Sequence, residues 1–115
     1  SITTSGFNAK KLELLEMTDQ MAEDVVARYP DLAAAVKRRQ VYARFSTLNQ
    51  MLDVTEPDLV AKRNAIIKYL KVNQAQVVSD PKTPKRDKLG YLMLKFGFPM
   101  YKVAWKNYLK VKGQR

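Results

Sequence analysis

The basic and aromatic side chains of this 115-residue sequence are concentrated toward its C-terminal end. From Leu89 to Val111, lysines recur among aromatic and aliphatic residues at helical spacing. Steps of seven, seven, four and four residues place five lysines on one stripe of a single helix: Lys88, Lys95, Lys102, Lys106 and Lys110. So many charges are too costly for a helix that crosses a bilayer. The pattern is typical of a basic amphipathic helix that lies on a membrane surface.

Two groups of side chains would bind the membrane surface. Basic groups attract anionic lipid head groups, and the candidates are Lys82, Lys85, Arg86, Lys88, Lys95, Lys102, Lys106 and Lys110. Aromatic rings are favoured at the membrane–water interface, and the candidates are Phe96, Phe98, Tyr101, Trp105 and Tyr108. The alternative is a helix whose apolar face packs in the protein core or on a partner while its lysines face water. The sequence alone leaves both interpretations open.

The residues needed for common catalytic sites are missing. The chain has no Cys and no His, which removes thiol nucleophiles, imidazole bases and the usual zinc ligands. Its four glycines are isolated and it has no Asp-x-Asp pair, so we expect neither a phosphate-binding loop nor a metal–nucleotide site. The carboxylates near the N-terminus are interpreted as the solvated face of a helix: Glu13, Glu16, Asp19, Glu23 and Asp24. We therefore expect no catalytic residue, metal or cofactor in this chain.

Charge is distributed unevenly along the chain, whose formal net charge is +10. Residues 1–57 contain seven basic and eight acidic residues, whereas residues 58–115 contain fourteen basic and three acidic ones. This bias predicts a polyanionic partner, either anionic lipid or nucleic acid. The aromatic residues lie among aliphatic ones rather than at the spacing of a base-stacking platform. Nucleic acid is therefore the less favoured partner.

Hydrophobic periodicity and helix breakers predict an all-α chain that forms one domain. Three helices joined by short turns should make an antiparallel core within residues 1–78, and they are expected over residues 9–28, 30–52 and 56–78. Asn8 should cap the first helix, and Thr55 with Asp58 should form a capping box for the third. The basic tail, residues 79–115, should begin a helix after Thr83–Pro84 and divide near Gly97–Pro99. The total is four or five helices in a bundle-like arrangement, ending in a basic amphipathic pair.

Apolar positions predict which face of each core helix is buried. On the first helix these are Leu14, Met17, Met21 and Val25. On the second helix the face begins at Leu32, Ala35 and Val36 and continues through Val41, Phe45, Leu48 and Leu52. On the third it comprises Leu59, Ile66, Ile67, Leu70 and Val77. A basic cluster on the second helix could touch phosphate, but pairing with the acidic face of the first is favoured: Lys37, Arg38, Arg39 and Arg44.

Several segments resemble the region that follows the catalytic domain in bacterial family 2 glycosyltransferases. They are SITTS (1–5), NAKKL (8–12), RYPDL (28–32), RRQVYARFSTL (38–48), DPKTPKRD (80–87) and GFPMYK (97–102). The resemblance implies a C-terminal helical part of an enzyme that transfers a sugar from a nucleotide-sugar during capsule, exopolysaccharide or wall-polymer assembly. In that family the nucleotide and metal residues lie in the preceding GT-A domain. No catalytic position therefore carries over to this chain, although the parent protein should be a glycosyltransferase.

The resemblance and the charge pattern together predict a non-catalytic domain that positions the parent enzyme. Its expected partners are an anionic membrane surface and the GT-A domain of the same polypeptide. Nucleotide-sugars are cytosolic and lipid-linked acceptors stay in the membrane, so the expected location is cytoplasmic, peripheral to the inner face of the cell membrane. The alternative is a protein–protein interaction module, such as one that forms a homodimer, with nucleic-acid binding as a less favoured third function.

Overall fold

The computed structural model describes residues 10–113, without the side chains at positions 109 and 112. This part of the chain is all-α, as predicted, and contains no strand. It forms six α-helices and one short 3₁₀ turn: α1 (Lys10–Arg28), η1 (Pro30–Leu32), α2 (Ala33–Gln50), α3 (Pro57–Val72), α4 (Gln74–Ser79), α5 (Lys85–Leu94) and α6 (Phe98–Gly113). The expected cap at Asn8 lies outside the described residues.

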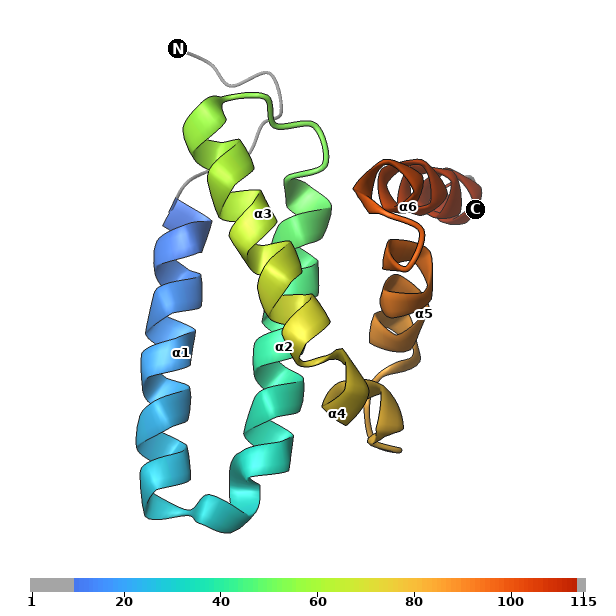
Figure 1. The fold of residues 1–115 in the computed structure, drawn as a ribbon. Helices are drawn as coiled ribbons and strands as arrows, with labels where there is room; N and C mark the ends of the chain where they lie inside the picture. The colour runs from blue at the N-terminus through green and yellow to red at the C-terminus, as the bar shows by residue number, and fades with distance from the viewer. Residues whose placement is uncertain (1–9, 114–115) are drawn as a thin grey trace.

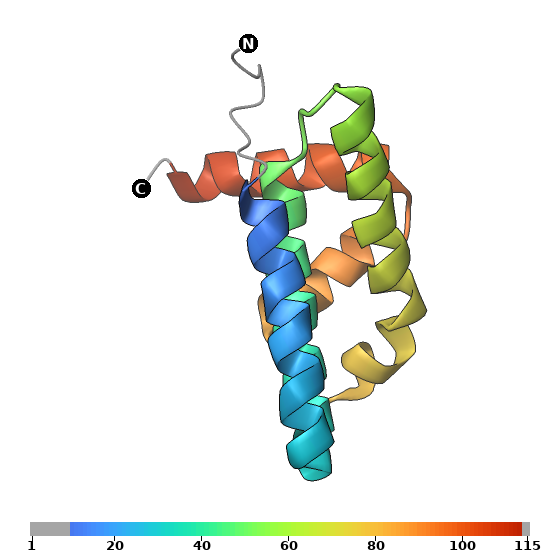
Figure 2. The ribbon, with the colours of Figure 1, turned by 90° about the vertical axis from the view of Figure 1, so that its left-hand side faces the viewer.

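Helix α2 is the element on which the others are assembled. Helices α1, α2 and α3 run alternately down, up and down (Figure 1), and α2 packs against both of its neighbours. Helices α4 and α5 continue from the lower end of α3, and α5 also packs on α2. Helix α6 then crosses the upper part of the molecule on the side away from α1 (Figure 2). The two outermost helices, α1 and α6, therefore present separate surfaces.

The break between the first two helices forms as predicted. Helix α1 ends at Arg28, and Pro30 opens the short turn that leads into α2. The cause is local, because the residue before a proline avoids helical backbone and proline itself suits the first turn of a helix.

The predicted boundaries of the third helix are wrong at two points. No side chain caps α3, whose N-cap is Glu56, so the capping box of Thr55 and Asp58 does not form. The helix also stops at Val72 instead of running on to residue 78. The side-chain amide of Asn73 donates a hydrogen bond of 2.9 Å to the carbonyl of Tyr69. The backbone N–H of Asn73 donates to the same carbonyl at 3.2 Å, so Tyr69 accepts two hydrogen bonds at the point where α3 ends.

The C-terminal pair of helices divides where Gly97 and Pro99 predict a division. Gly97 has a φ of 96°, which lies in the left-handed region that glycine adopts without a steric penalty. Its N–H donates to the carbonyl of Leu94 at 2.9 Å, and its own carbonyl accepts from the N–H of Tyr101 at 3.0 Å. One residue thus ends α5 and begins α6.

Buried apolar side chains from both parts of the chain form one cluster. Its members are Leu15, Val41, Phe45, Leu48, Met51, Leu52, Val54, Ile66, Leu70, Val77, Tyr91, Leu94, Tyr101 and Trp105. The predicted core positions of the second and third helices are confirmed from Val41 onward, with Leu59 and Ile67 half-buried against the cluster. Leu32 and Ala35 at the start of α2 are exposed instead. The C-terminal helices are therefore part of the core.

The predicted core face of the first helix is wrong at three of its four positions, while the fourth, Val25, is half-buried. Leu14, Met17 and Met21 are 60, 57 and 64% exposed. The buried residues of α1 are Leu15 and Ala22, which belong to the neighbouring stripe of the same helix. Helix α1 carries two apolar stripes, and only one of them faces α2. The outward stripe of Leu14, Met17 and Met21 is called the α1 stripe below.

Candidate docking surfaces

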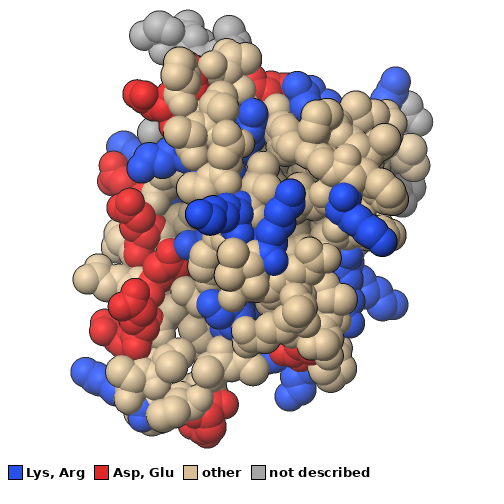
Figure 3. All heavy atoms as spheres, viewed as in Figure 1, with Lys and Arg blue, Asp and Glu red and all other residues tan. Residues whose placement is uncertain are grey.

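Charge is segregated on the folded surface as it is along the sequence. Acidic side chains gather along the edge formed by α1, while basic side chains spread over the middle and the right-hand side of the visible face (Figure 3). Helix α6 contains lysines and no acidic residue. The two outermost helices of the fold therefore differ in charge as well as in position.

The five lysines predicted on one stripe do not lie on one helix. Lys88 is on α5, and Lys95 directly follows the last residue of α5. The turn at Gly97 then redirects the chain, so only the three lysines on α6 keep the predicted spacing: Lys102, Lys106 and Lys110. Helical periodicity had been extended across a position where the helix ends.

The five aromatic residues expected at a membrane interface are divided between core and surface. Tyr101 and Trp105 are buried, with 0 and 6% exposure, and Phe98 and Tyr108 are half-buried against the core. Phe96 is 67% exposed. In this fold Tyr101 and Trp105 are not available to lipid, which corrects the expectation for those two rings.

The buried and half-buried rings of α6 form a row that attaches this helix to the core. Centroid distances along Phe98, Tyr101, Trp105 and Tyr108 are 6.3, 6.5 and 5.2 Å. The ring of Phe45 on α2 lies 6.4 Å from that of Tyr101. Burial raises the pKa of the Tyr101 hydroxyl, which keeps this group a neutral hydrogen-bond donor. The aromatic row thus decides which side of α6 faces outward.

The outward side of α6 is apolar and basic at once. Met100, Val103 and Val111 are 52, 56 and 68% exposed. Lys106 and Lys110 follow Val103 by three and seven residues, so they lie on the same side of the helix. We call these five residues the outer α6 face. The sequence places Met100 and Val103 on the apolar faces of this helix, but only its aromatic rings were chosen as candidates for the membrane interface.

Two lysines of α6 also contact the loop after α2. The Nζ atoms of Lys106 and Lys102 lie 2.5 and 3.4 Å from Oδ1 of Asp53. The hydrogen bond from Lys106 is the main cause that lowers the pKa of Asp53. All three side chains are well exposed to water, so the pairs orient the lysines but add little stability.

Arg86 joins α5 to α2. Its guanidinium donates to the carbonyl of Tyr42 at 3.1 Å and to Oγ of Ser46 at 3.2 Å, and it lies 4.0 Å from the centre of the Tyr42 ring. It also pairs with Asp87 at 2.9 Å. Burial raises the pKa of the Asp87 carboxyl in spite of this pair. Among the predicted basic residues, Arg86 is thus engaged within the fold, while Lys82, Lys85, Lys95 and Lys110 are exposed.

A polar network joins α1 to α2. Arg44 donates hydrogen bonds of 2.8 and 2.5 Å to the two carboxylate oxygens of Asp19, and Gln40 donates a third of 3.1 Å. The guanidinium of Arg44 lies 3.6 Å from the centre of the Tyr69 ring. The predicted pairing of the basic cluster with the acidic helix is therefore confirmed for Arg44. This network turns Asp19 inward and leaves the α1 stripe outside.

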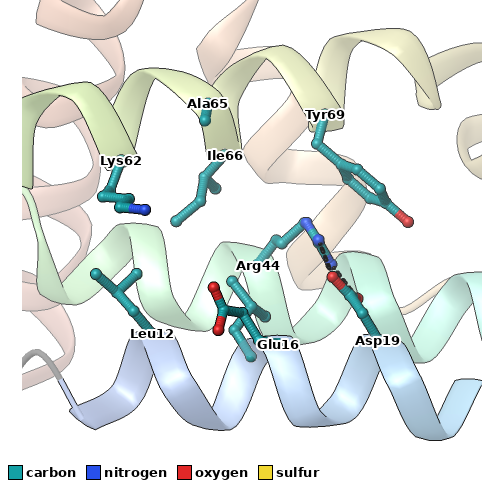
Figure 4. A pocket seen from close by; sticks show the side chains of 9 residues that line it. Leu12, Glu16, Asp19, Arg44, Lys62, Ala65, Ile66 and Tyr69 are labelled. Carbon is teal, nitrogen blue, oxygen red and sulfur yellow. Dashed lines mark hydrogen bonds and ion pairs between the residues drawn. The ribbon is translucent and has the colours of Figure 1, made fainter.

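A pocket of about 220 Å³ opens beside this network, between α1 and α3 (Figure 4). Leu12, Leu15 and Ile66 supply its apolar walls, and the Asp19–Arg44 pair lies at one end. We assign no ligand to this pocket, because its buried cation is already engaged by Asp19.

Neither a metal cluster nor a membrane span is found in the part of the chain that the structure covers. Within residues 10–113, no three acidic side chains come together in a way that could bind a metal ion. None of the helices over the same residues has the length and hydropathy needed to cross a bilayer.

No protein-family model matches the chain, and neither does a curated protein or a solved structure.

The Asp19–Arg44 pair predicts a pH-dependent stability. The hydrogen bond from Arg44 is the main cause that lowers the pKa of Asp19 below its ordinary value of 3.8. Ionised Asp19 therefore stabilises the fold above that value, and the contribution is lost as pH falls through the lowered pKa. Asp19→Asn should reduce the free energy of unfolding by about 2 kcal/mol at neutral pH. Urea unfolding at several pH values measures this.

The matched control is Glu16→Gln, which removes an exposed carboxylate from the same helix. This variant should unfold like the unmodified chain at neutral pH. The difference caused by Asp19→Asn should shrink in acid. If that difference is constant between neutral and acid pH, the ion pair does not have the assigned role.

Proposed function

We propose that this chain is a non-catalytic docking module that holds its parent enzyme on an anionic membrane surface through the outer α6 face. The supporting observation is that α6 has two apolar sides. One is buried in the core, and the other is exposed and also carries lysines. Tyr101 and Trp105 pack inward, while three aliphatic side chains are exposed beside lysines on the opposite side. The overall charge of +10 favours an anionic partner.

The physical mechanism combines weak insertion with electrostatic attraction. The side chains of Met100, Val103 and Val111 enter the interfacial layer, and the lysine ammonium groups extend to lipid phosphates. Each lysine close to an anionic surface contributes about 1 kcal/mol. The attraction is screened beyond roughly 10 Å at 0.1 M salt. Binding is therefore reversible, prefers anionic lipid and weakens as salt is added.

The resemblance to family 2 glycosyltransferases suggests what is being positioned. Such an enzyme takes its donor sugar from the cytosol and adds it to an acceptor that stays in the membrane. A domain that keeps the catalytic part at the inner leaflet brings both substrates within reach. The proposed location is accordingly cytoplasmic and peripheral to the cell membrane.

The α1 stripe is the surface proposed for the GT-A domain of the parent enzyme. The resemblance places the GT-A domain before this segment of the polypeptide, and α1 is the described helix that comes next to it in sequence. Because α1 and α6 lie on different sides of the molecule (Figures 1 and 2), a catalytic domain and a membrane could cover them at the same time. The module would then join the catalytic domain to the membrane.

Sedimentation with phosphatidylglycerol vesicles tests the membrane contact. Replacing Lys110, an exposed lysine of the outer α6 face, by Gln removes one charge at about 1 kcal/mol, so partitioning should fall roughly fivefold. Replacing Met100 and Val103 by Ser should also weaken binding while leaving the charge unchanged. The matched control is Leu14→Ser with Met17→Ser on the α1 stripe, which should bind like the unmodified chain. Equal binding by all four proteins would contradict the proposal.

Methionine oxidation tests the catalytic-domain contact. Hydrogen peroxide should oxidise Met17 and Met21 readily in the 115-residue chain, because both are exposed, while buried Met51 should react slowly. In the parent enzyme Met17 and Met21 should react several-fold more slowly. Met100, on the outer α6 face, should stay reactive until vesicles are added. If Met17 and Met21 react at the same rate in both proteins, the catalytic domain does not cover the α1 stripe.

A further inference from the structure

We propose that a shallow groove between α2 and the loop before α5 binds a phosphate group. The groove has a volume of about 320 Å³ and is lined by Ala35, Arg38, Arg39, Tyr42, Lys82 and Pro84. Three of these residues are cationic and none is anionic. The groove shares no residue with the outer α6 face, and the proposal does not depend on membrane docking by α6.

One wall of the groove is a single side of α2. Ala35, Arg38 and Tyr42 are separated by three and four residues, which places them in a row on the helix surface. Arg39 adjoins this row and is exposed. Arg38 does not pair with the acidic helix α1, as the sequence had suggested, but with Asp80 in the facing loop at 2.6 Å.

The opposite wall is a loop whose shape is fixed by its own hydrogen bonds. One oxygen of Asp80 accepts from Arg38, and the other accepts from the backbone N–H of Lys82 at 2.9 Å. The buried hydroxyl of Thr83 donates to the carbonyl of Val77 at 2.7 Å. These bonds hold Lys82 across the groove from the arginines. The cations are thus brought together by a preformed turn.

Asp80 does not cancel the positive charge of the groove. Its carboxylate is engaged by Lys82 and Arg38, whose hydrogen bonds lower its pKa, so it stays ionised and positions Arg38. A guanidinium has five N–H donors, so Arg38 keeps donors for a ligand. Arg39 and Lys82 add two further positive charges. The balance of the four side chains is positive.

The N-terminus of α5 adds to the positive electrostatic potential of the groove. Helix α5 begins at Lys85, directly after Pro84 in the groove, and the start of a helix carries partial positive charge. Asp87 in the first turn is buried and paired with Arg86. Lys82 in the groove and Lys85 at the first position of α5 are both exposed cations.

Phosphate is the ligand that this set of donors fits. Guanidinium groups bind phosphate oxygens through paired hydrogen bonds, and an ammonium adds a point charge. The phosphate could belong to a lipid head group or to a soluble phosphate ester, since both present the same oxygens. The sequence did not bring these residues together, because the arginines and Lys82 come from distant segments and their spacing carries no signal.

Titration of the 115-residue chain with glycerol 3-phosphate, followed by amide NMR shifts, tests the soluble source. Sedimentation with phosphatidylglycerol and phosphatidylcholine vesicles tests the lipid source. The site variant is Arg39→Gln with Lys82→Gln, in which both side chains are exposed. The control, Lys68→Gln with Lys71→Gln on α3, removes the same charge from exposed positions elsewhere. Circular dichroism checks that both variants keep their helices.

The proposal expects the site variant to lose about tenfold in affinity, the effect of one charged hydrogen bond, while the control loses much less. Saturable amide shifts near Arg39 and Lys82 with glycerol 3-phosphate support a soluble ligand. Binding confined to phosphatidylglycerol vesicles, with the same difference between variants, supports a lipid head group. Equal losses in both variants, or no binding in either experiment, would overturn the proposal, since the groove would then be no more than part of a diffuse positive surface.

Discussion

The contact of Phe45 with two tyrosines holds the C-terminal helices on the core, and the outward surface of α6 depends on it. The ring of Phe45 meets Tyr91 edge-on at 5.0 Å and lies 6.4 Å from Tyr101. Helix α5 can approach this closely because position 90 is glycine, where an added Cβ would lie 2.7 Å from the Phe45 ring. The Tyr91 hydroxyl, kept neutral by burial that raises its pKa, donates to the carbonyl of Leu70 at 2.8 Å. With one side of α6 fixed inward, Met100 and Val103 on the other side remain more than half exposed.

Local rules predicted the parts of the fold that depend on neighbouring residues. Proline at position 30 and glycine at position 97 ended helices where expected, because their backbone preferences act within one turn. The buried faces of α3 and of α2 from Val41 onward followed from helical periodicity. The face of α1 did not, because two apolar stripes compete there, and the side that packs on α2 also carries Asp19, which pairs with Arg44 far along the chain. A distant ion pair has no signature in the periodicity of one helix.

The C-terminal surface was predicted in composition but not in geometry. A basic and aromatic helix pair was expected, and the structure contains one. The lysine stripe had been continued through Gly97, where a positive φ ends it. The aromatic face had been assigned to lipid, whereas Tyr101 and Trp105 meet Phe45 and the core. Sequence alone cannot tell whether an aromatic face finds its partner inside the same chain. The sequence suggested phosphate contact as the less favoured role of the basic cluster on α2, but it did not show the groove of Arg38, Arg39 and Lys82, because a turn brings its two walls together.

In the proposed docking, α6 binds the membrane with its aliphatic side outward while its aromatic side stays in the core. Trp105 is the only tryptophan of the chain and there is no cysteine, so a fluorophore on Val103→Cys reports on one side of α6 and Trp105 on the other. Quenching by lipids brominated in their acyl chains, in phosphatidylglycerol vesicles, compares the two directly. The account predicts strong quenching of the label at position 103 and little quenching of Trp105. Equal quenching of both would show that α6 leaves the core to bind lipid, and quenching of Trp105 alone would reverse the assigned orientation.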